Sequence, residues 1–242
     1  MRYSSVLVAA TASAAAAANN ATCNSVQIFL VRGHGESVPG RQTSITDAIC
    51  SDDSSNSNSS SSRTCGYQSI AYDANSGADT ICQDQYDGIQ MLRGNLTAYA
   101  TACPSSRLVV SGWSQGGALV ADLFAGGGDG LDLTGTCVQP TSPALAPDEF
   151  PGPHIAAFVT FGELHHNADM PWNVGNGSAA NGRYPRTKTM LENLSLWTDR
   201  FRDYCVVDDP LCARGTEVAA HSSYFQSAYW PGLVAEFVRS RL

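Results

Sequence analysis

The sequence has few basic residues, no long apolar run and no Cys-x-x-Cys pair, and each absence argues against one class of protein. Basic residues are few, with 14 Lys and Arg against 22 Asp and Glu, and the net charge of −8 argues against nucleic acid or an anionic membrane surface as a partner. No apolar run reaches the roughly 20 residues that a membrane-spanning helix needs. The cysteines include no Cys-x-x-Cys pair, which argues against a structural zinc site. A nucleic-acid-binding, integral membrane or zinc-finger protein is therefore not expected.

The first residues have the layout of a secretory signal peptide. Arg2 precedes an apolar run over residues 6–10, and small residues follow up to Ala18. The alternative is a disordered alanine-rich tail. We expect residues 1–18 to be removed and the protein to be secreted and extracellular. Residues 19–242 show no repeat or linker and can bury a full core, so a single domain is expected.

Export changes what the cysteines indicate. An even number of cysteines in an oxidising compartment suggests four disulfides. Five Asn-x-Ser/Thr sequons fit an exported glycoprotein, although serine-rich sequences also produce sequons by chance. The cysteines are Cys23, Cys50, Cys65, Cys82, Cys103, Cys137, Cys205 and Cys212, and the sequons begin at Asn20, Asn58, Asn95, Asn176 and Asn193.

Five segments have the pattern of strands. Residues 26–31, 107–112 and 154–161 are short, continuous apolar runs, as expected for strands covered on both faces. Residues 68–74 and 199–207 show the pattern less clearly.

Helical patterns lie between these strands. Apolar residues recur at three- and four-residue steps over residues 86–99, and a second helix begins at Gln115 and ends in glycines. Residues 187–197 and 223–241 are further candidates, the latter interrupted at Pro231. Alternating strands and helices predict an α/β fold: a three-layer α/β/α sandwich around a central, mostly parallel, five-stranded sheet.

Two polar stretches interrupt this order. Residues 50–65 are rich in serine and cannot build a core, so a surface loop is expected there. Residues 163–186 are rich in Gly, Asn and Pro and are also expected to form a loop.

Ser114 is the strongest candidate for a catalytic residue. It lies in Gly-x-Ser-x-Gly between a predicted strand and a predicted helix, the context of a nucleophile elbow. Gly112 and Gly116 are needed there because a side chain would collide with the neighbouring strand or helix. The backbone N–H of Gln115, at the helix start, is a candidate oxyanion donor.

A serine nucleophile needs a histidine base and a carboxylate that orients the histidine. In α/β-hydrolases the chain order is Ser, then Asp or Glu, then His, and His221 follows the paired acids Asp208 and Asp209. His221 is expected in a short loop before the last helix; the alternative is a helix-capping histidine on an ordinary surface loop.

The other histidines after Ser114 are weaker candidates. His154 opens a predicted strand, where a structural role is expected. His165 and His166, with Glu163 and Asp169, have the residue types of a metal site. Adjacent histidines on a loop are more often solvated, and no metal is expected.

Taken together, "GWSQGG", "CVVDDPLC" and "AAHSSY" resemble the cutinase and acetylxylan esterase family of secreted serine esterases. Similarity extends through "IFLVRGHGES", "CPSSRLVVSGWSQGG", "DLFAGGGD" and "FVTFGE", over nearly all of the expected mature chain. The resemblance implies a small, lidless α/β-hydrolase that needs no cofactor and uses Ser114, His221 and Asp209. It favours Asp209 over Asp208 because the family's acid lies four residues after the first cysteine of the pair.

The resemblance also implies disulfides Cys23–Cys103 and Cys205–Cys212. The remaining four cysteines are assigned to Cys50–Cys65, which would close the serine-rich segment, and Cys82–Cys137, and their other pairings stay open. One position departs from the family. Where the family has Ser or Thr after Arg-Gly, with its backbone N–H and hydroxyl on the oxyanion, this chain has His34. The backbone N–H of His34 can still donate, and a ring N–H could replace the hydroxyl. Glu163 replaces a family aspartate, and the sequence indicates no consequence.

The resemblance implies an ester substrate and leaves its class open. Cutin-type polyesters or short-chain acyl esters are slightly favoured, and acetyl groups on xylan are the alternative. An alternative function of another class is that of a secreted binding protein or effector that kept the fold and lost efficient catalysis. A monomer without a nucleic-acid or membrane partner is expected.

Overall fold

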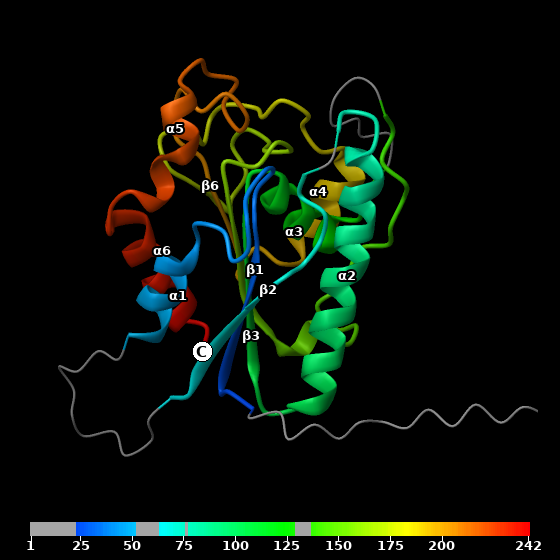
Figure 1. The fold of residues 1–242 in the computed structure, drawn as a ribbon, viewed down its shortest axis with the longest axis vertical. Helices are drawn as coiled ribbons and strands as arrows, with labels where there is room; N and C mark the ends of the chain where they lie inside the picture. The colour runs from blue at the N-terminus through cyan, green and yellow to red at the C-terminus, as the bar shows by residue number, and fades with distance from the viewer. Residues whose placement is uncertain (1–22, 52–62, 76, 129–136) are drawn as a thin grey trace, which may run out of the picture.

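The computed structural model describes residues 23–51, 63–75, 77–128 and 137–242. Its centre is one six-stranded sheet in the order β2-β1-β3-β4-β6-β5, and every neighbouring pair is parallel (Figure 1). The strands are β1 (Val26–Val31), β2 (Cys65–Ser69), β3 (Arg107–Trp113), β4 (Ile155–Phe161), β5 (Asn173–Val174) and β6 (Phe201–Tyr204). The predicted α/β fold with a parallel central sheet is confirmed, with six strands in place of five. The expected signal peptide and the sequons at Asn20 and Asn58 lie outside the described residues.

The apolar runs form strands because both faces of the sheet are covered. All six residues of β1 are buried, and successive side chains of a strand point to opposite faces. Ile28 and Leu30 accordingly belong to one apolar cluster, and Phe29 and Val31 to the other.

Helices cover both faces of this sheet, which completes three layers. In Figure 1, α2, α3 and α4 lie on one side of the strands, and α1, α5 and α6 on the other. In the part of the chain that the structure describes, no helix is long and apolar enough to cross a membrane. The helices are α1 (Thr43–Cys50), α2 (Ile81–Ala102), α3 (Gln115–Ala125), α4 (Lys188–Ser195), α5 (Val218–Ser222) and α6 (Tyr229–Arg239), with 3₁₀ turns η1 (Gly152–His154) and η2 (Ser223–Phe225).

The strand predicted at residues 68–74 overlaps β2 only at its start. Beyond Ser69 the carbonyls of Ile70 and Tyr72 accept hydrogen bonds from the guanidinium of Arg32, whose side chain takes the place of a partner strand. Ile70, Tyr72 and Ala74 are buried, but the segment does not continue the sheet.

Three further local expectations are wrong. Pro231 lies in the first turn of α6 and does not interrupt it, since backbone N–H groups there have no partner within the helix. His221 lies in α5 rather than in a loop. β5 forms inside the segment 163–186, which was expected to contain only loop.

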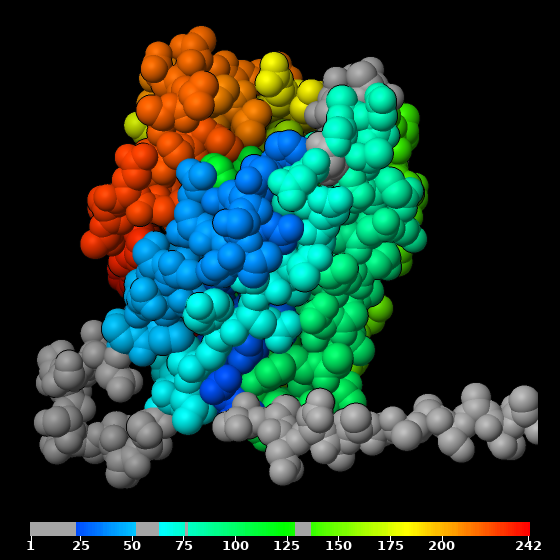
Figure 2. Space-filling view, viewed as in Figure 1, coloured from blue at the N-terminus to red at the C-terminus, as the bar shows by residue number. Residues whose placement is uncertain are grey.

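The carboxyl ends of the parallel strands meet at one edge of the sheet, where ligands of α/β proteins usually bind. The segment after β1 contains His34, β3 leads into Ser114, and Gly162 follows β4. Figure 2 shows a hollow between the blue segment after β1 and the orange segment around α5, with green atoms from the region of α3 at its floor.

Candidate active site

Ser114 occupies a strained turn between β3 and α3. Its φ of 56° and ψ of −124° lie in a region that non-glycine residues rarely adopt. The turn is tight because a Cβ on Gly112 would lie 2.3 Å from the carbonyl oxygen of Gly116, and a Cβ on Gly116 would lie 2.3 Å from that of Val31. This is the geometry of a nucleophile elbow.

His221 lies against the serine. Its Nε2 is 2.9 Å from Oγ of Ser114, a hydrogen-bonding distance, and its side chain is 13% exposed. The imidazole can therefore accept the proton of the hydroxyl. The short helix α5 places His221 at the carboxyl edge of the sheet.

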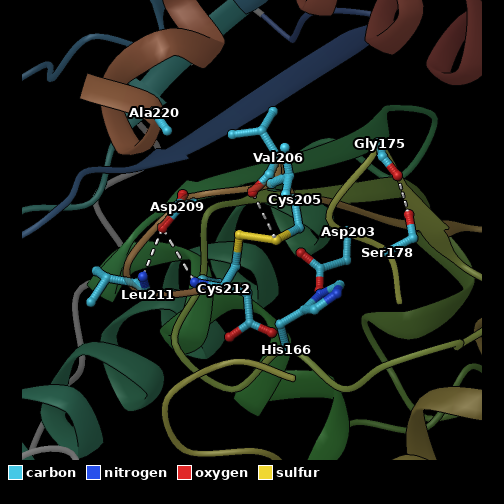
Figure 3. The surroundings of a disulfide bond; sticks show 12 residues. His166, Gly175, Ser178, Asp203, Cys205, Val206, Asp209, Leu211, Cys212 and Ala220 are labelled. Atoms are coloured by element: carbon cyan, nitrogen blue, oxygen red, sulfur yellow. Dashed lines mark hydrogen bonds and ion pairs between the residues drawn. A yellow bond between two sulfur atoms is a disulfide. The ribbon is translucent and has the colours of Figure 1, made fainter. Parts of the chain in front are cut away.

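Asp209 lies on the other side of the imidazole. Its Oδ2 and Oδ1 are 3.0 and 3.1 Å from Nδ1 of His221, and the side chain is fully buried. Oδ1 also accepts hydrogen bonds from the backbone N–H groups of Leu211 and Cys212, at 2.8 and 3.3 Å (Figure 3). The Cys205–Cys212 disulfide closes the loop that carries the aspartate. The carboxylate is thus held in one orientation before any substrate binds.

Asp208 is exposed and no contact with the imidazole is found for it among the described residues. Its φ of 68° is in the left-handed region that favours glycine and that aspartate tolerates better than most residues.

Two residues that sequence reasoning did not single out complete this side of the site. The hydroxyl of Tyr224 donates to Oδ2 of Asp209 at 2.8 Å, and burial together with that carboxylate raises the pKa of Tyr224 well above its usual range. Gly162 has a φ of 53°, and a Cβ there would lie 2.7 Å from Oδ2 of Asp209 and 2.9 Å from Nδ1 of His221. The glycine in "FVTFGE" was the available signal for this close approach.

The backbone N–H groups of Gln115 and His34 are the predicted oxyanion donors. Gln115 begins α3, so its N–H has no acceptor within the helix. Within the described residues no acceptor takes the N–H of His34. The imidazole of His34 is exposed, and its Nδ1 lies 3.2 Å from Oε1 of the buried Gln115 side chain. At least one ring nitrogen of His34 therefore faces this amide.

His165 and His166 are fully buried, so the expectation that they are solvated is wrong. His165 contacts Asp122 of α3 at 3.1 Å, and His166 contacts Asp203 of β6 at 2.5 Å. Figure 3 shows the His166–Asp203 pair beside the Cys205–Cys212 disulfide. Among the described residues, no group of three or more His, Cys, Asp or Glu side chains could hold a metal ion.

Arg186 connects the acids of this cluster. Its guanidinium contacts Asp122 at 3.0 Å and Glu163 at 2.5 Å, and all three side chains are buried. The glutamate found in place of the family's aspartate thus reaches an arginine. The cluster links α3, the end of β4 and β6, the elements next to Ser114, Gly162 and the Asp209 loop.

The described cysteines form four disulfides. They are Cys23–Cys103, Cys50–Cys65, Cys82–Cys137 and Cys205–Cys212, the same pairs as in the sequence-based assignment.

Comparison with known proteins identifies the family. The family model described as "Cutinase" matches residues 22–242. "Cutinase 11" of Verticillium dahliae is 28% identical over 181 residues, which cover 72% of this chain and 57% of that protein. "Acetylxylan esterase 2" of Talaromyces purpureogenus is 28% identical over 179 residues, which cover 74% of this chain and 69% of that protein. The match thus spans little more than half of the Verticillium relative.

Solved structures show the same fold. The catalytic core domain of acetyl xylan esterase from Trichoderma reesei superposes with a TM-score of 0.70 at 20% identity. The superposition covers 91% of this chain and 100% of that one. The cutinase of Trichoderma reesei gives a TM-score of 0.52 at 18% identity, covering 90% of this chain and 76% of that one. Because the family model matches residues 22–242, nearly the whole chain, the chain belongs to the cutinase family.

Proposed function

We propose that this protein is a secreted serine esterase in which Ser114, His221 and Asp209 form the catalytic triad. One observation carries the proposal: Oγ of Ser114, the imidazole of His221 and the carboxylate of Asp209 form one line of contacts of 2.9 and 3.0 Å. Such a line is the arrangement that activates a serine hydroxyl for acyl transfer.

In the proposed mechanism, Nε2 of His221 removes the proton of Ser114 as Oγ attacks the carbonyl carbon of an ester. The backbone N–H groups of Gln115 and His34 bind the oxyanion of the tetrahedral intermediate. His221 then protonates the leaving alcohol, and an acyl-enzyme remains. Water, deprotonated by the same imidazole, releases the carboxylic acid. Asp209 orients His221 and stabilises its charged form throughout.

The proposed substrate is a carboxylic ester, either a cutin-type polyester or a short-chain acyl ester. The match to "Acetylxylan esterase 2" supports acetylated xylan as the second candidate. The alternative function of a different class is a secreted binding protein on the same fold. It predicts that Ser114 does not react with a serine-hydrolase probe.

A fluorophosphonate probe separates the esterase from the binding protein. Ser114 is expected to be labelled, and Ser114→Ala is expected to abolish the label. An intact, folded protein that resists the probe would refute the proposed function. Parallel turnover of p-nitrophenyl acetate, butyrate and longer esters, and of acetylated xylan, then identifies the substrate class.

The proposed oxyanion donors can be tested at His34. Loss of one oxyanion donor costs about 3 to 4 kcal/mol of transition-state stabilisation. A fall of that size in kcat for His34→Ala would assign the ring a direct role, and an unchanged kcat would restrict His34 to its backbone N–H.

A further inference from the structure

The indole of Trp113, the residue before the candidate nucleophile, is packed against the candidate base. Its ring centroid lies 4.9 Å from that of His221, with 31° between the ring planes. Its Nε1–H donates to the backbone carbonyl of His221 at 2.9 Å. Trp113 is 5% exposed, so its indole is closely packed. Trp113 thus restrains both the main chain and the imidazole of His221.

A cation lies on this indole. The guanidinium carbon of Arg41 is 4.0 Å from the Trp113 ring centroid, close enough for a cation–π interaction. Nε of Arg41 donates to Oε1 of Glu36 at 2.6 Å, and the two side chains are 40% and 9% exposed. The ion pair fixes the guanidinium over the ring.

Glu36 also binds the backbone next to His34, one of the proposed oxyanion donors. Oε2 of Glu36 accepts the backbone N–H of Gly33 at 2.8 Å, and Gly33 directly precedes His34. The Cα of Gly33 packs on the indole, since a Cβ there would lie 2.3 Å from Cε3 of Trp113. One carboxylate oxygen of Glu36 therefore binds the backbone just before His34. The other oxygen binds Arg41, which lies on the indole beside His221.

We propose that Glu36 and Arg41 are positioning residues for ester hydrolysis, coupling the segment that carries His34 to the imidazole of His221 through the indole of Trp113. The inference rests on the proposed function. Neither residue touches Ser114, so both act on the geometry of the groups that do. Misplacement of a reacting group by about 1 Å is enough to lower the rate of the chemical step.

Glu36 and Arg41 also border a cavity, so the alternative explanation is that they bind substrate. Glu36, Arg41, Ser222 and Phe225 are among the residues that line a space of about 590 Å³ beside the site. A residue that binds substrate there would change KM, whereas a positioning residue changes kcat.

The first test is Arg41→Ala, assayed with p-nitrophenyl butyrate. We expect kcat to fall about 3- to 10-fold while KM changes less than about twofold. Arg41→Lys, which keeps the charge but replaces the planar guanidinium over the indole, is expected to recover part of kcat. The matched control is Lys188→Ala, which breaks the exposed Lys188–Glu192 pair on α4 and should leave both constants unchanged.

The second test is a double-mutant cycle with Glu36→Ala. Because the two side chains act as one unit, the double variant is expected to lose less kcat than the product of the two single losses. Melting temperatures confirm that each variant is folded. An unchanged kcat for Arg41→Ala, an effect confined to KM, or fully multiplicative losses would overturn the inference. These outcomes leave a reactive Ser114 in the wild-type protein, whereas an unreactive Ser114 would refute the proposed function itself.

Discussion

The hydroxyl of Tyr224 lies 2.8 Å from Oδ2 of Asp209, the same carboxylate oxygen that contacts Nδ1 of His221. Since Oδ1 accepts two backbone N–H groups, both oxygens of the buried carboxylate are held by donors other than the imidazole. These donors hold the buried carboxylate in the orientation that faces the imidazole.

Tyr224→Phe removes one of these donors without changing the shape of the core. We expect kcat for p-nitrophenyl butyrate to fall about 10-fold with little change in KM, since a hydrogen bond to a charged group contributes about 1.5 to 3 kcal/mol. Tyr99→Phe is the control, because it loses the contact of its hydroxyl with the N–H of Asn24, far from the site. Equal effects of the two variants would contradict a specific role for Tyr224.

The adjacent aspartates are expected to differ sharply. Asp209→Asn retains the volume of the side chain but removes the charge that holds His221 in the productive tautomer, and a loss in kcat of about 10⁴-fold is expected. Asp208→Asn changes an exposed side chain and should retain most activity. If Asp208→Asn abolished turnover and Asp209→Asn spared it, the assignment of the acid would be wrong.

Gly162→Ala is expected to disable the site without a direct change to the triad. The new methyl group would lie 2.7 Å from Oδ2 of Asp209 and 2.9 Å from Nδ1 of His221, and the φ of 53° adds backbone strain. Displacement of the acid–base pair should lower kcat about 100-fold and slow fluorophosphonate labelling in parallel.

The matched control for Gly162→Ala is Gly94→Ala in α2. A Cβ on Gly94 meets nothing within 4 Å, so this substitution should leave activity unchanged and favour the helix slightly. Wild-type kcat in Gly162→Ala would show that the site tolerates a side chain at this position.

The buried ionic cluster predicts a pH dependence of stability. Burial lowers the pKa of His166, but the carboxylate of Asp203 more than offsets this, so the pKa is raised above 6.5. Burial raises the pKa of Glu163 above 4.5, and Arg186 opposes this only in part. For both groups the native state binds protons more tightly than the unfolded state. The stabilisation from His166 is therefore fully present below pH 6.5 and is lost as pH rises through its folded pKa.

Urea unfolding from about pH 5 to about pH 8 measures this effect as a free energy of unfolding that decreases with rising pH. His166→Gln should flatten the slope. His154→Gln, which removes a histidine outside the cluster, should not. A slope that His166→Gln leaves unchanged would assign the pH dependence to other groups.

Local sequence patterns determined the continuous apolar strands, the helix after Ser114 and the family. These features depend on short segments: burial on both faces of a strand requires an unbroken apolar run, and the turn at Ser114 requires small residues at fixed offsets. The chain order also indicated Ser114, His221 and one of two adjacent acids, and the resemblance to the family favoured Asp209. Their roles in catalysis stay predictions that the experiments above test.

Only the tertiary structure decided which side chains meet across distant segments. The burial of His165 and His166 depends on Asp122, Asp203 and Arg186, which come from three separate parts of the chain. The contacts of Tyr224 with Asp209 and of Arg41 with Trp113 are equally invisible in local patterns. Hydrophobic periodicity reports burial of a segment against water, whereas the pairing of polar groups depends on the packing of the whole fold.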